Sequence, residues 1–324
     1  MRSLTCLCAH SDLGGGETFL VNFLNALSPY FNICCVGQPE PSLVKTFLGC
    51  EVLWDNLEHN YLDSSKSRVE GIKPDVFINY VYKHIHYPIG KDLNVALVLF
   101  PIKELKPMLK GYDKVITISE YSAKYIREWW DIDPEIIHPA IEVPRVYQTM
   151  DKLNAVCNIS RFFMEKDGHS KNQHFLIDRL KESLPQDWKA FFVGWCGDQD
   201  QQYFEVCQGR MDDRMKAIVN TPYSDAQEYL KASKVYIHAN GYGRENPAQA
   251  EHFGYIFLEA LRAGCVIVSH NSGNTTLSDF TYHDKTDFGT ALEQAIHAWP
   301  TNRHVPINYT LNFFNERVRR AFEL

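Results

Sequence analysis

Short apolar segments of strand length alternate with amphipathic segments of helical length along the whole 324-residue chain. This alternation predicts an α/β fold with parallel sheets, because a helix must carry the chain back between two parallel strands. In the first part of the chain we predict strands at residues 4–9, 32–36, 76–80, 95–99 and 114–118. Three glycines, residues 14–16, follow the first strand, and the apolar positions after them predict a helix.

The pattern restarts after a connection with two prolines, residues 137–144. Proline favours extended backbone, so this connection predicts a boundary between two domains. Beyond it we predict strands at residues 155–159, 190–194, 216–219, 235–239 and 266–269. We therefore expect a first domain at residues 1–145, a second at 152–305, and an amphipathic terminal helix within 306–324. A ligand is expected in a crevice between the two domains.

The composition is that of a globular protein, with 45% hydrophobic and 23% charged residues. A formal net charge of −7 disfavours non-specific coating of nucleic acid, although it leaves room for a local basic cleft. The nine cysteines contain no C-x-x-C pair, which argues against a zinc ribbon and favours buried thiols in a reducing compartment. The apolar stretch at the amino terminus is too short for a signal peptide, and no segment approaches the ~20 apolar residues of a membrane-spanning helix. The sequence thus predicts a soluble, cytoplasmic protein.

Two glutamates, Glu251 and Glu259, flank the start of a short helix that we predict between Gly254 and Gly264. Glycine suits the left-handed turn that ends a helix. Glu259 lies within an apolar stripe, where a carboxylate is costly unless something hydrogen-bonds it. Ahead of the helix, Glu251 and the small Gly254 leave room for a ligand to meet backbone N–H groups at the positive helix end. The arrangement predicts an anionic, hydroxyl-rich ligand such as a sugar nucleotide.

Three segments together resemble a known family. Glu251-His-Phe-Gly with Glu259 resembles the E-x7-E signature of retaining glycosyltransferases of the GT-B fold, specifically family 4. Ser160-Arg161 with Lys171-Asn-Gln resembles the region that grips the donor diphosphate in that family, and Gly14-Gly-Gly-Glu resembles its first-domain glycine loop. The resemblance implies two Rossmann-like domains facing across a cleft. The amino-terminal domain would lie on the acceptor side, the carboxyl-terminal domain would bind the nucleotide sugar, and the terminal helix would pack back toward the first domain.

The resemblance also implies a set of site residues. Arg161 and Lys171 would hold the donor diphosphate and stabilise the leaving phosphate where other enzymes use a metal ion. Glu251 would hydrogen-bond hydroxyls of the transferred sugar, and Glu259 the ribose hydroxyls. The other residues expected to bind the donor are Gly15, Gly16, Gly194, Phe253, Gly254, Tyr255 and Asn274.

The reaction implied is transfer of a hexose-type sugar from a nucleoside diphosphate donor to an acceptor hydroxyl, with retention of configuration. The acceptor attacks the face that the nucleotide is leaving, and the departing β-phosphate oxygen takes its proton. The protein then contributes positioning and electrostatics, with no cofactor and no metal. The acceptor hydroxyl belongs to a glycan, a lipid-linked glycan or a nucleic acid, and neither it nor the donor base and sugar, nor the oligomeric state, follows from the sequence.

Two departures from the family pattern favour an alternative interpretation. Many relatives have a first-domain histidine near the reacting carbon, whereas residues 96–102 contain none, which leaves His10, His84 and His86 as substitutes or as ordinary histidines. Residues 271–276 stand where relatives often have Gly-Gly-x-x-Glu. Both departures would suit a catalytically silent protein of this fold that binds nucleotide sugars as a scaffold.

Other surface patterns have competing interpretations. A row of lysines would suit a nucleic-acid acceptor carrying a modified base, although a solvated helix face is simpler; the row is Lys103, Lys106, Lys110 and Lys114. An aromatic stripe beside Lys124 and Arg127 favours a buried stripe, or else contact with a membrane surface; it consists of Tyr121, Tyr125 and Trp129. Two D-x-D pairs, at residues 131–133 and 198–200, match a metal-binding motif in letters alone, and we predict solvated loops there.

Overall fold

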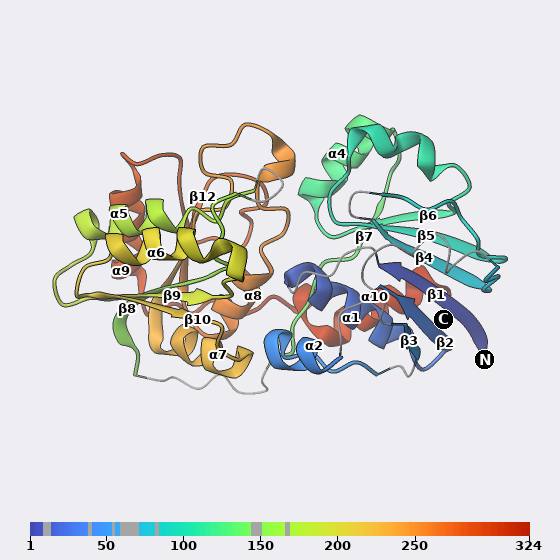
Figure 1. Cartoon of the computed structure of the whole chain (residues 1–324), viewed down its shortest axis with the longest axis horizontal. Helices are drawn as coiled ribbons and strands as arrows, with labels where there is room; N and C mark the ends of the chain where they lie inside the picture. The colour runs from blue at the N-terminus through green and yellow to red at the C-terminus, as the bar shows by residue number, and fades with distance from the viewer. Residues whose placement is uncertain are drawn as a thin grey trace. The chain divides into compact units, whose positions relative to one another are not determined.

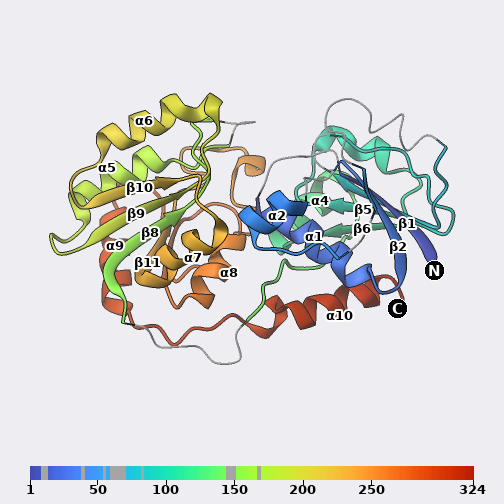
Figure 2. The ribbon, with the colours of Figure 1, turned by 60° about the horizontal axis from the view of Figure 1, so that its bottom comes forward.

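A computed structural model describes residues 1–8, 14–37, 41–53, 56–58, 71–81, 84–143, 151–165 and 169–324 (Figure 1). The chain divides into two compact units, Met1–Ala140 with Ile307–Leu324, and Ile141–Pro306. Each unit is built on a parallel β-sheet flanked by helices (Figures 1 and 2). The predicted α/β fold with two Rossmann-like domains is therefore confirmed.

The first unit contains a seven-stranded sheet in the order β3-β2-β1-β4-β5-β6-β7. Its strands are β1 (Arg2–Cys8), β2 (Phe31–Val36), β3 (Asn56–Glu58), β4 (Val76–Val81), β5 (Leu93–Val98), β6 (Lys114–Thr117) and β7 (Glu135–Ile136). Its helices are α1 (Gly15–Leu27), α2 (Pro41–Leu48), α4 (Glu120–Trp130) and α10 (Leu311–Ala321), with 3₁₀ turns η1 (Lys103–Leu109) and η4 (Ile307–Tyr309). The central strands are buried along nearly their whole length, as expected for a sheet that is covered on both faces.

The last helix, α10, belongs to the first unit although it follows the second in the chain. It packs on α1 through aromatic contacts: the ring centroids of Phe19 and Phe314 lie 5.8 Å apart, and those of Phe23 and Phe322 lie 5.9 Å apart. Because these rings are buried, the chain end is anchored to the first unit by apolar contact.

The second unit contains a six-stranded sheet in the order β10-β9-β8-β11-β12-β13. Its strands are β8 (Leu153–Ile159), β9 (Lys189–Gly194), β10 (Met215–Val219), β11 (Ser233–His238), β12 (Val266–His270) and β13 (Phe280–Tyr282). Its helices are α5 (Gln173–Ser183), α6 (Gln201–Arg210), α7 (Tyr223–Ala232), α8 (Tyr255–Arg262) and α9 (Phe288–Ala298), with short 3₁₀ turns η2 (Asp198–Asp200) and η3 (Pro247–Gln249).

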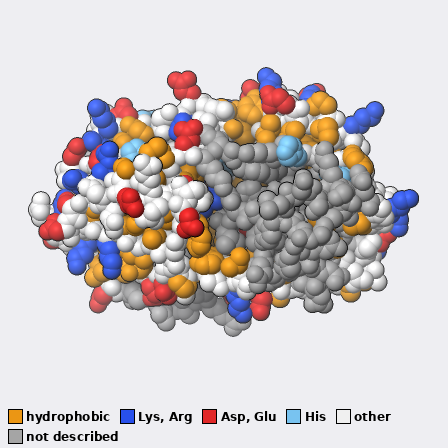
Figure 3. Space-filling view, in the orientation of Figure 1, with side chains coloured by type: hydrophobic (Ala, Val, Ile, Leu, Met, Phe, Trp, Pro, Cys, Tyr) orange, Lys and Arg blue, Asp and Glu red, His pale blue; other side chains and the backbone are white. Residues whose placement is uncertain are grey.

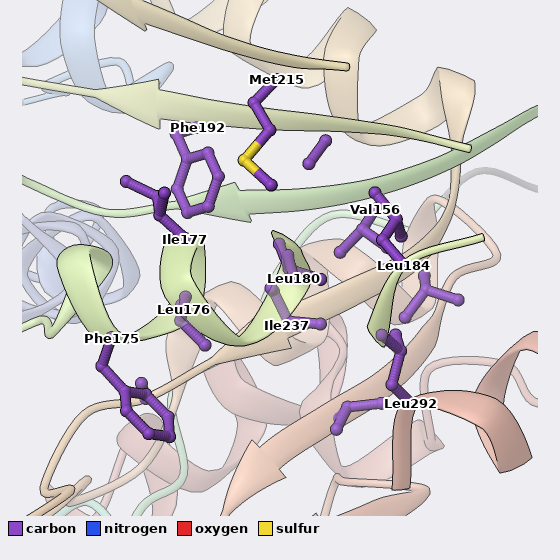
Figure 4. Packing of buried hydrophobic residues seen from close by; sticks show 14 of the residues in the cluster. Val156, Phe175, Leu176, Ile177, Leu180, Leu184, Phe192, Met215, Ile237 and Leu292 are labelled. Atoms are coloured by element: carbon purple, nitrogen blue, oxygen red, sulfur yellow. The ribbon is translucent and has the colours of Figure 1, made fainter. Parts of the chain in front are cut away.

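The core of the second unit lies between this sheet and helices α5, α6 and α9, whereas α7 and α8 cover the other face (Figure 2). Leu176, Ile177 and Leu180 of α5 are buried against the sheet residues Val156 and Phe192 (Figure 4). These α5 positions recur at the spacing of one helical face, which is why the segment buries a single apolar stripe.

The strand order of the second unit places a topological switch point between β8 and β11. From β8 the chain proceeds to β9 and β10 on one side, and from β11 to β12 and β13 on the other. In open α/β sheets the loops that leave the carboxyl ends of two such strands diverge and leave a binding crevice. The loops after β8 and β11 are those that carry Arg161 and Glu251.

The lysine row and the aromatic stripe predicted from the sequence can both be located in the structure. Lys103, Lys106 and Lys110 are exposed, but Lys114 begins β6 and donates to the Ala321 carbonyl at 2.5 Å, so the four lysines do not share one helix face. The aromatic stripe on α4 is half-buried around Phe100, and apolar side chains gather on the surface over this helix (Figure 3). Among the described residues, no helix has the length and apolar character needed to cross a membrane.

Candidate active site

Three residues predicted to be catalytic meet at the switch point of the second unit. Arg161 follows β8, Lys171 precedes α5, and Glu251 precedes α8. Lys171 lies close enough to the other two for their charges to act on it. Burial lowers the pKa of Lys171, the Glu251 carboxylate opposes that change, and the Arg161 guanidinium adds to it. The arrangement offers two cations beside one carboxylate, which suits an anionic ligand with hydroxyl groups.

The loop that carries Arg161 is held in place by residues of the Lys171-Asn-Gln segment. Gln173 donates its Nε2 to the Arg161 carbonyl at 2.7 Å and to the Ser160 hydroxyl at 2.9 Å. Asn172 donates its Nδ2 to the Ala239 carbonyl at 3.0 Å, which ties this loop to the end of β11. Asn172 and Gln173 therefore hold the loops around Arg161 and the end of β11 in place. The sequence analysis assigns this role to neither residue.

Glu251 is saturated with hydrogen bonds from its own unit. Its Oε2 accepts from His238 Nε2 at 3.0 Å and from Asn240 Nδ2 at 3.1 Å. Its Oε1 accepts from the N–H of Gly254 at 2.8 Å and of Phe253 at 3.3 Å. A carboxylate offers about four lone-pair positions, and four donors surround this one. A sugar hydroxyl could hydrogen-bond Glu251 in this arrangement only by replacing one of them.

These donors keep Glu251 ionised. Burial would raise the pKa of its carboxyl group, but the hydrogen bond from His238 and the nearby charge of Lys171 outweigh burial and hold that pKa well below its usual range. Gly254, in the left-handed region at φ +81°, turns its N–H toward the carboxylate. The sequence predicts that N–H groups at this helix start meet a ligand, but the N–H of Gly254 donates to the carboxylate of Glu251 instead.

His238 and Asn240 both hydrogen-bond Glu251 and are not among the site residues predicted from the sequence. A carboxylate only accepts hydrogen bonds, so His238 Nε2 carries hydrogen, and its Nδ1 lies 3.2 Å from the Tyr236 hydroxyl. Burial lowers the pKa of His238 and so favours the neutral ring, while the Glu251 carboxylate opposes this change. Asn240 is 4% exposed, and its Oδ1 has no hydrogen-bond partner among the described residues. The only signal in the sequence was that both polar residues lie at the end of a predicted strand.

The loop after β12 fixes the backbone of Glu251. Gly273 pairs with Glu251 in an isolated bridge, and a Cβ at Gly273 would lie 2.0 Å from the Glu251 carbonyl oxygen. Asn274 donates its backbone N–H to that oxygen at 2.6 Å and its Nδ2 to the Phe253 carbonyl at 2.9 Å. Asn274 and Phe253 are both buried, so the structure shows them holding the turn.

Glu259 lies on α8 and faces α7. Its Oε1 accepts from the Tyr223 hydroxyl at 2.8 Å and its Oε2 from Gln227 Nε2 at 3.1 Å, while Arg262 donates to both of those partners. The side chain is 6% exposed. Burial raises the pKa of Glu259, and its hydrogen bonds and Arg262 offset only part of that effect. Helix α8 begins one residue after Gly254 and ends before Gly264, at φ +73°, close to the predicted limits.

The remaining predicted residues are more dispersed. Tyr255 is the first residue of α8, and Gly194 is the last residue of β9, the strand next to β8. Gly15 and Gly16 belong to the other unit, where they form the first turn of α1. Three histidines were considered as substitutes for the first-domain histidine near the reacting carbon. His84 is exposed, His86 is 5% exposed, and His10 lies outside the described residues.

The D-x-D pairs lie in polar surroundings. Asp131 and Asp133 are exposed, and Asp133 accepts from Arg127 at 2.7 Å. Asp198 is exposed as well, at the start of η2. Within the described ranges, no group of three or more His, Cys, Asp or Glu side chains is placed to hold a metal ion.

Comparison with known proteins shows similarity to glycosyltransferases. Residues 150–278 match the family model of the glycosyl transferases group 1, a range that includes every residue of the cluster above. The human GDP-Man:Man(3)GlcNAc(2)-PP-Dol alpha-1,2-mannosyltransferase is 22% identical over 306 residues, covering 80% of this chain. The mouse protein of the same name is 22% identical over 189 residues, covering 53% of this chain. The chain spans 59% and 37% of the lengths of these two relatives.

Solved structures show the same fold. HepE of Anabaena, solved in complex with UDP and glucose, superposes with a TM-score of 0.71 at 14% identity over 100% of both chains. AviGT4, a glycosyltransferase involved in avilamycin A biosynthesis, gives a TM-score of 0.64 at 10% identity over 100% of this chain and 97% of its own. The fold is thus that of GT-B glycosyltransferases. All three comparisons agree on one enzyme class, the glycosyltransferases.

Proposed function

We propose that the chain is a retaining glycosyltransferase of family 4 that transfers a hexose from a nucleoside diphosphate sugar to an acceptor hydroxyl. The observation that carries the proposal is the cluster of Arg161, Lys171 and Glu251 at the switch point of a unit that matches the glycosyl transferases group 1. An α/β sheet binds its ligands at such a point.

In the proposed complex Arg161 and Lys171 bind the diphosphate. The guanidinium offers a planar fork of donors and the ammonium a compact charge, so the pair neutralises the negative charge that grows on the leaving phosphate. Because the protein supplies this charge, we propose that transfer needs no metal ion. The β-phosphate oxygen takes the proton of the acceptor hydroxyl on the face where the new bond forms.

The two glutamates recognise hydroxyl groups in this proposal. At Glu251, a sugar hydroxyl exchanges with the Asn240 amide on Oε2, since the other donors to this carboxylate are a buried histidine ring and the N–H groups of the turn. At Glu259, the ribose hydroxyls add to the donors from Tyr223 and Gln227, because two lone-pair positions of that carboxylate are not used by these residues. We also propose that Gly15 and Gly16 of the first unit bind the donor, and that the first unit binds the acceptor.

The relatives narrow the choice of substrates to test. The mannosyltransferase relatives carry GDP-Man and a lipid-linked glycan in their names, and HepE was solved with UDP and glucose. We therefore propose a hexose donor on UDP or GDP and an acceptor hydroxyl on a lipid-linked glycan. From the sequence alone we also propose a cytoplasmic enzyme.

The test is donor turnover by the purified chain against UDP-, GDP- and ADP-hexoses, with wild type compared with Arg161→Met. We expect one donor class to be consumed by the wild type and to be consumed about a hundredfold more slowly by the variant, because a preorganised charge on the leaving group is lost. NMR of the product should show the same anomeric configuration as the donor. Donor binding without turnover on any acceptor would favour a silent binding protein, and inversion would contradict the mechanism.

A further inference from the structure

A large aromatic side chain is exposed beside the diphosphate site. β9 ends at Gly194, and the next residue, Trp195, exposes 45% of its surface. Among the tryptophans that the structure describes, it is the one classed as exposed, whereas Trp130 and Trp188 are buried. Large apolar side chains at the surface merit an explanation when they stand at a ligand-binding edge of a sheet.

The backbone on both sides of Trp195 is fixed. Its carbonyl accepts from the Phe162 N–H at 2.7 Å. The next residue, Cys196, donates its N–H to Asn220 Oδ1 at 2.8 Å and accepts from Asn220 Nδ2 at 3.0 Å. Asn220 holds this clamp from a left-handed backbone conformation, φ +57°, which a non-glycine residue adopts at a cost. The indole is therefore presented on a backbone that loses little freedom when a ligand binds.

The clamp also sets the distance to the proposed diphosphate site. Phe162 and Cys196 pair in parallel just beyond the ends of β8 and β9. The residues before them, Arg161 and Trp195, are therefore neighbours on adjacent chain segments, which run about 5 Å apart in such a pair. A guanidinium and an indole carried by neighbouring residues of paired segments suit a ligand that joins a phosphate group to a flat ring.

We infer that Trp195 is the platform on which the base of the donor nucleotide stacks, an inference that rests on the proposed function. Every base has a π-face, so stacking adds affinity with little dependence on base identity. The side-chain amide of Asn220 is engaged by Cys196 through both of its ends, so it serves the clamp rather than the edges of the base. The platform should therefore strengthen the binding of UDP and of GDP alike.

The experiment is calorimetric titration of the purified full chain with UDP, GDP and inorganic pyrophosphate. Trp195→Ala should weaken UDP and GDP roughly tenfold to a hundredfold, the usual worth of one base stack, and leave pyrophosphate affinity unchanged. Trp195→Phe should retain most of the affinity because it keeps an aromatic face. Val206→Ala, which trims a 40% exposed side chain on α6, is the matched control and should bind like the wild type.

The outcomes separate this inference from the function beneath it. If the wild type binds UDP or GDP and Trp195→Ala binds them equally well, the platform is wrong while the diphosphate site survives. If Trp195→Ala loses pyrophosphate as well, the residue supports the loop and the platform is again wrong. A wild type that binds pyrophosphate but neither nucleotide also overturns the platform. A wild type that binds none of the three overturns the proposed function and the platform together.

Discussion

The surroundings of Glu251 and Glu259 shift the pKa of the same kind of side chain in opposite directions. Four donors and a nearby ammonium surround Glu251, and they hold the pKa of its carboxyl well below the usual range. Two donors reach Glu259, and burial raises its pKa. Both side chains are largely buried, so the difference between their pKa values comes from the number of donors and charges around each carboxyl group.

This contrast assigns the two glutamates different parts. Glu251 is a fixed anion, and the turn of Phe253 and Gly254 is organised around it. Glu259 belongs to a polar network between α7 and α8 that keeps unused acceptor capacity. We expect changes at Glu251 to affect folding and activity together, and changes at Glu259 to affect nucleotide binding with little effect on folding.

The largest effect is expected for Glu251→Gln. The amide would keep one acceptor oxygen and replace the other with an NH2 group. The donors on that side, either His238 and Asn240 or the N–H groups of Phe253 and Gly254, would lose their acceptor. Removing one partner of a buried charged network costs about 3–5 kcal/mol. Urea denaturation should show a loss of this size, and donor turnover should fall by about a hundredfold or more. A variant with wild-type stability and turnover would break the contrast.

The next largest effect on stability is expected from a pair of glycines, Gly273 beside Glu251 and Gly264 at the end of the helix that carries Glu259. Gly273 and Gly264 both have φ near +75°, but a Cβ at Gly273 would lie 2.0 Å from the Glu251 carbonyl oxygen, whereas at Gly264 its nearest contact would be 3.9 Å away. Gly264→Ala should therefore cost only the backbone strain, about 1 kcal/mol, and Gly273→Ala clearly more, about 2–3 kcal/mol. Only Gly273→Ala should also weaken donor turnover. Equal melting temperatures for the two variants would show that the loop after β12 does not position Glu251.

A smaller effect is expected at His238. His238→Phe removes the ring N–H that donates to Glu251 and leaves a carboxylate position unpaired, which should cost about 2 kcal/mol. His238→Gln keeps a donor and should recover about half of that loss. A positioning residue should also change the pH profile of turnover, because the pKa of Glu251 depends on this hydrogen bond. If the pH profile of turnover is unchanged in both variants, His238 contributes to packing and does not position Glu251.

The smallest effect, and the one with opposite sign, is expected for Glu259→Gln. A carboxyl whose folded pKa is raised above the unfolded value, about 4.3, contributes stability below that value and loses it as pH rises through the folded pKa. Glutamine stays neutral, so the variant should match or exceed the wild type by up to about 1 kcal/mol at pH 7 and show no gain at pH 4.

Glu251→Gln is the matched control for this pH series. The lowered pKa of Glu251 gives stability that is present above about pH 4.3 and is lost only as pH falls through its much lower folded pKa. Its deficit should therefore persist from pH 7 to pH 4, whereas the gain of Glu259→Gln should vanish. Thermal unfolding across this range measures both, and parallel curves would refute the opposite pKa directions.

The sequence predicted most of the fold because long apolar runs mark central strands, as at β4 and β8. It missed β3, β7 and β13, which are two or three residues long, since so short a segment shows no period. It found Arg161, Lys171 and Glu251 through a family resemblance. It did not find His238, Asn240 or Asn220, because their partners lie across loops, and local pattern carries no information on contacts between residues 11 to 24 positions apart.

The central claim is that Arg161 and Lys171 bind a diphosphate next to the fixed anion Glu251. Calorimetric titration of UDP and GDP into wild type, Arg161→Met and Lys171→Met tests it most directly, with unfolding curves confirming that each variant is folded. We expect the wild type to bind at least one nucleotide and each variant to bind it about tenfold more weakly or worse, since a hydrogen bond to a charged group is lost. Folded variants that bind as tightly as the wild type would contradict the claim.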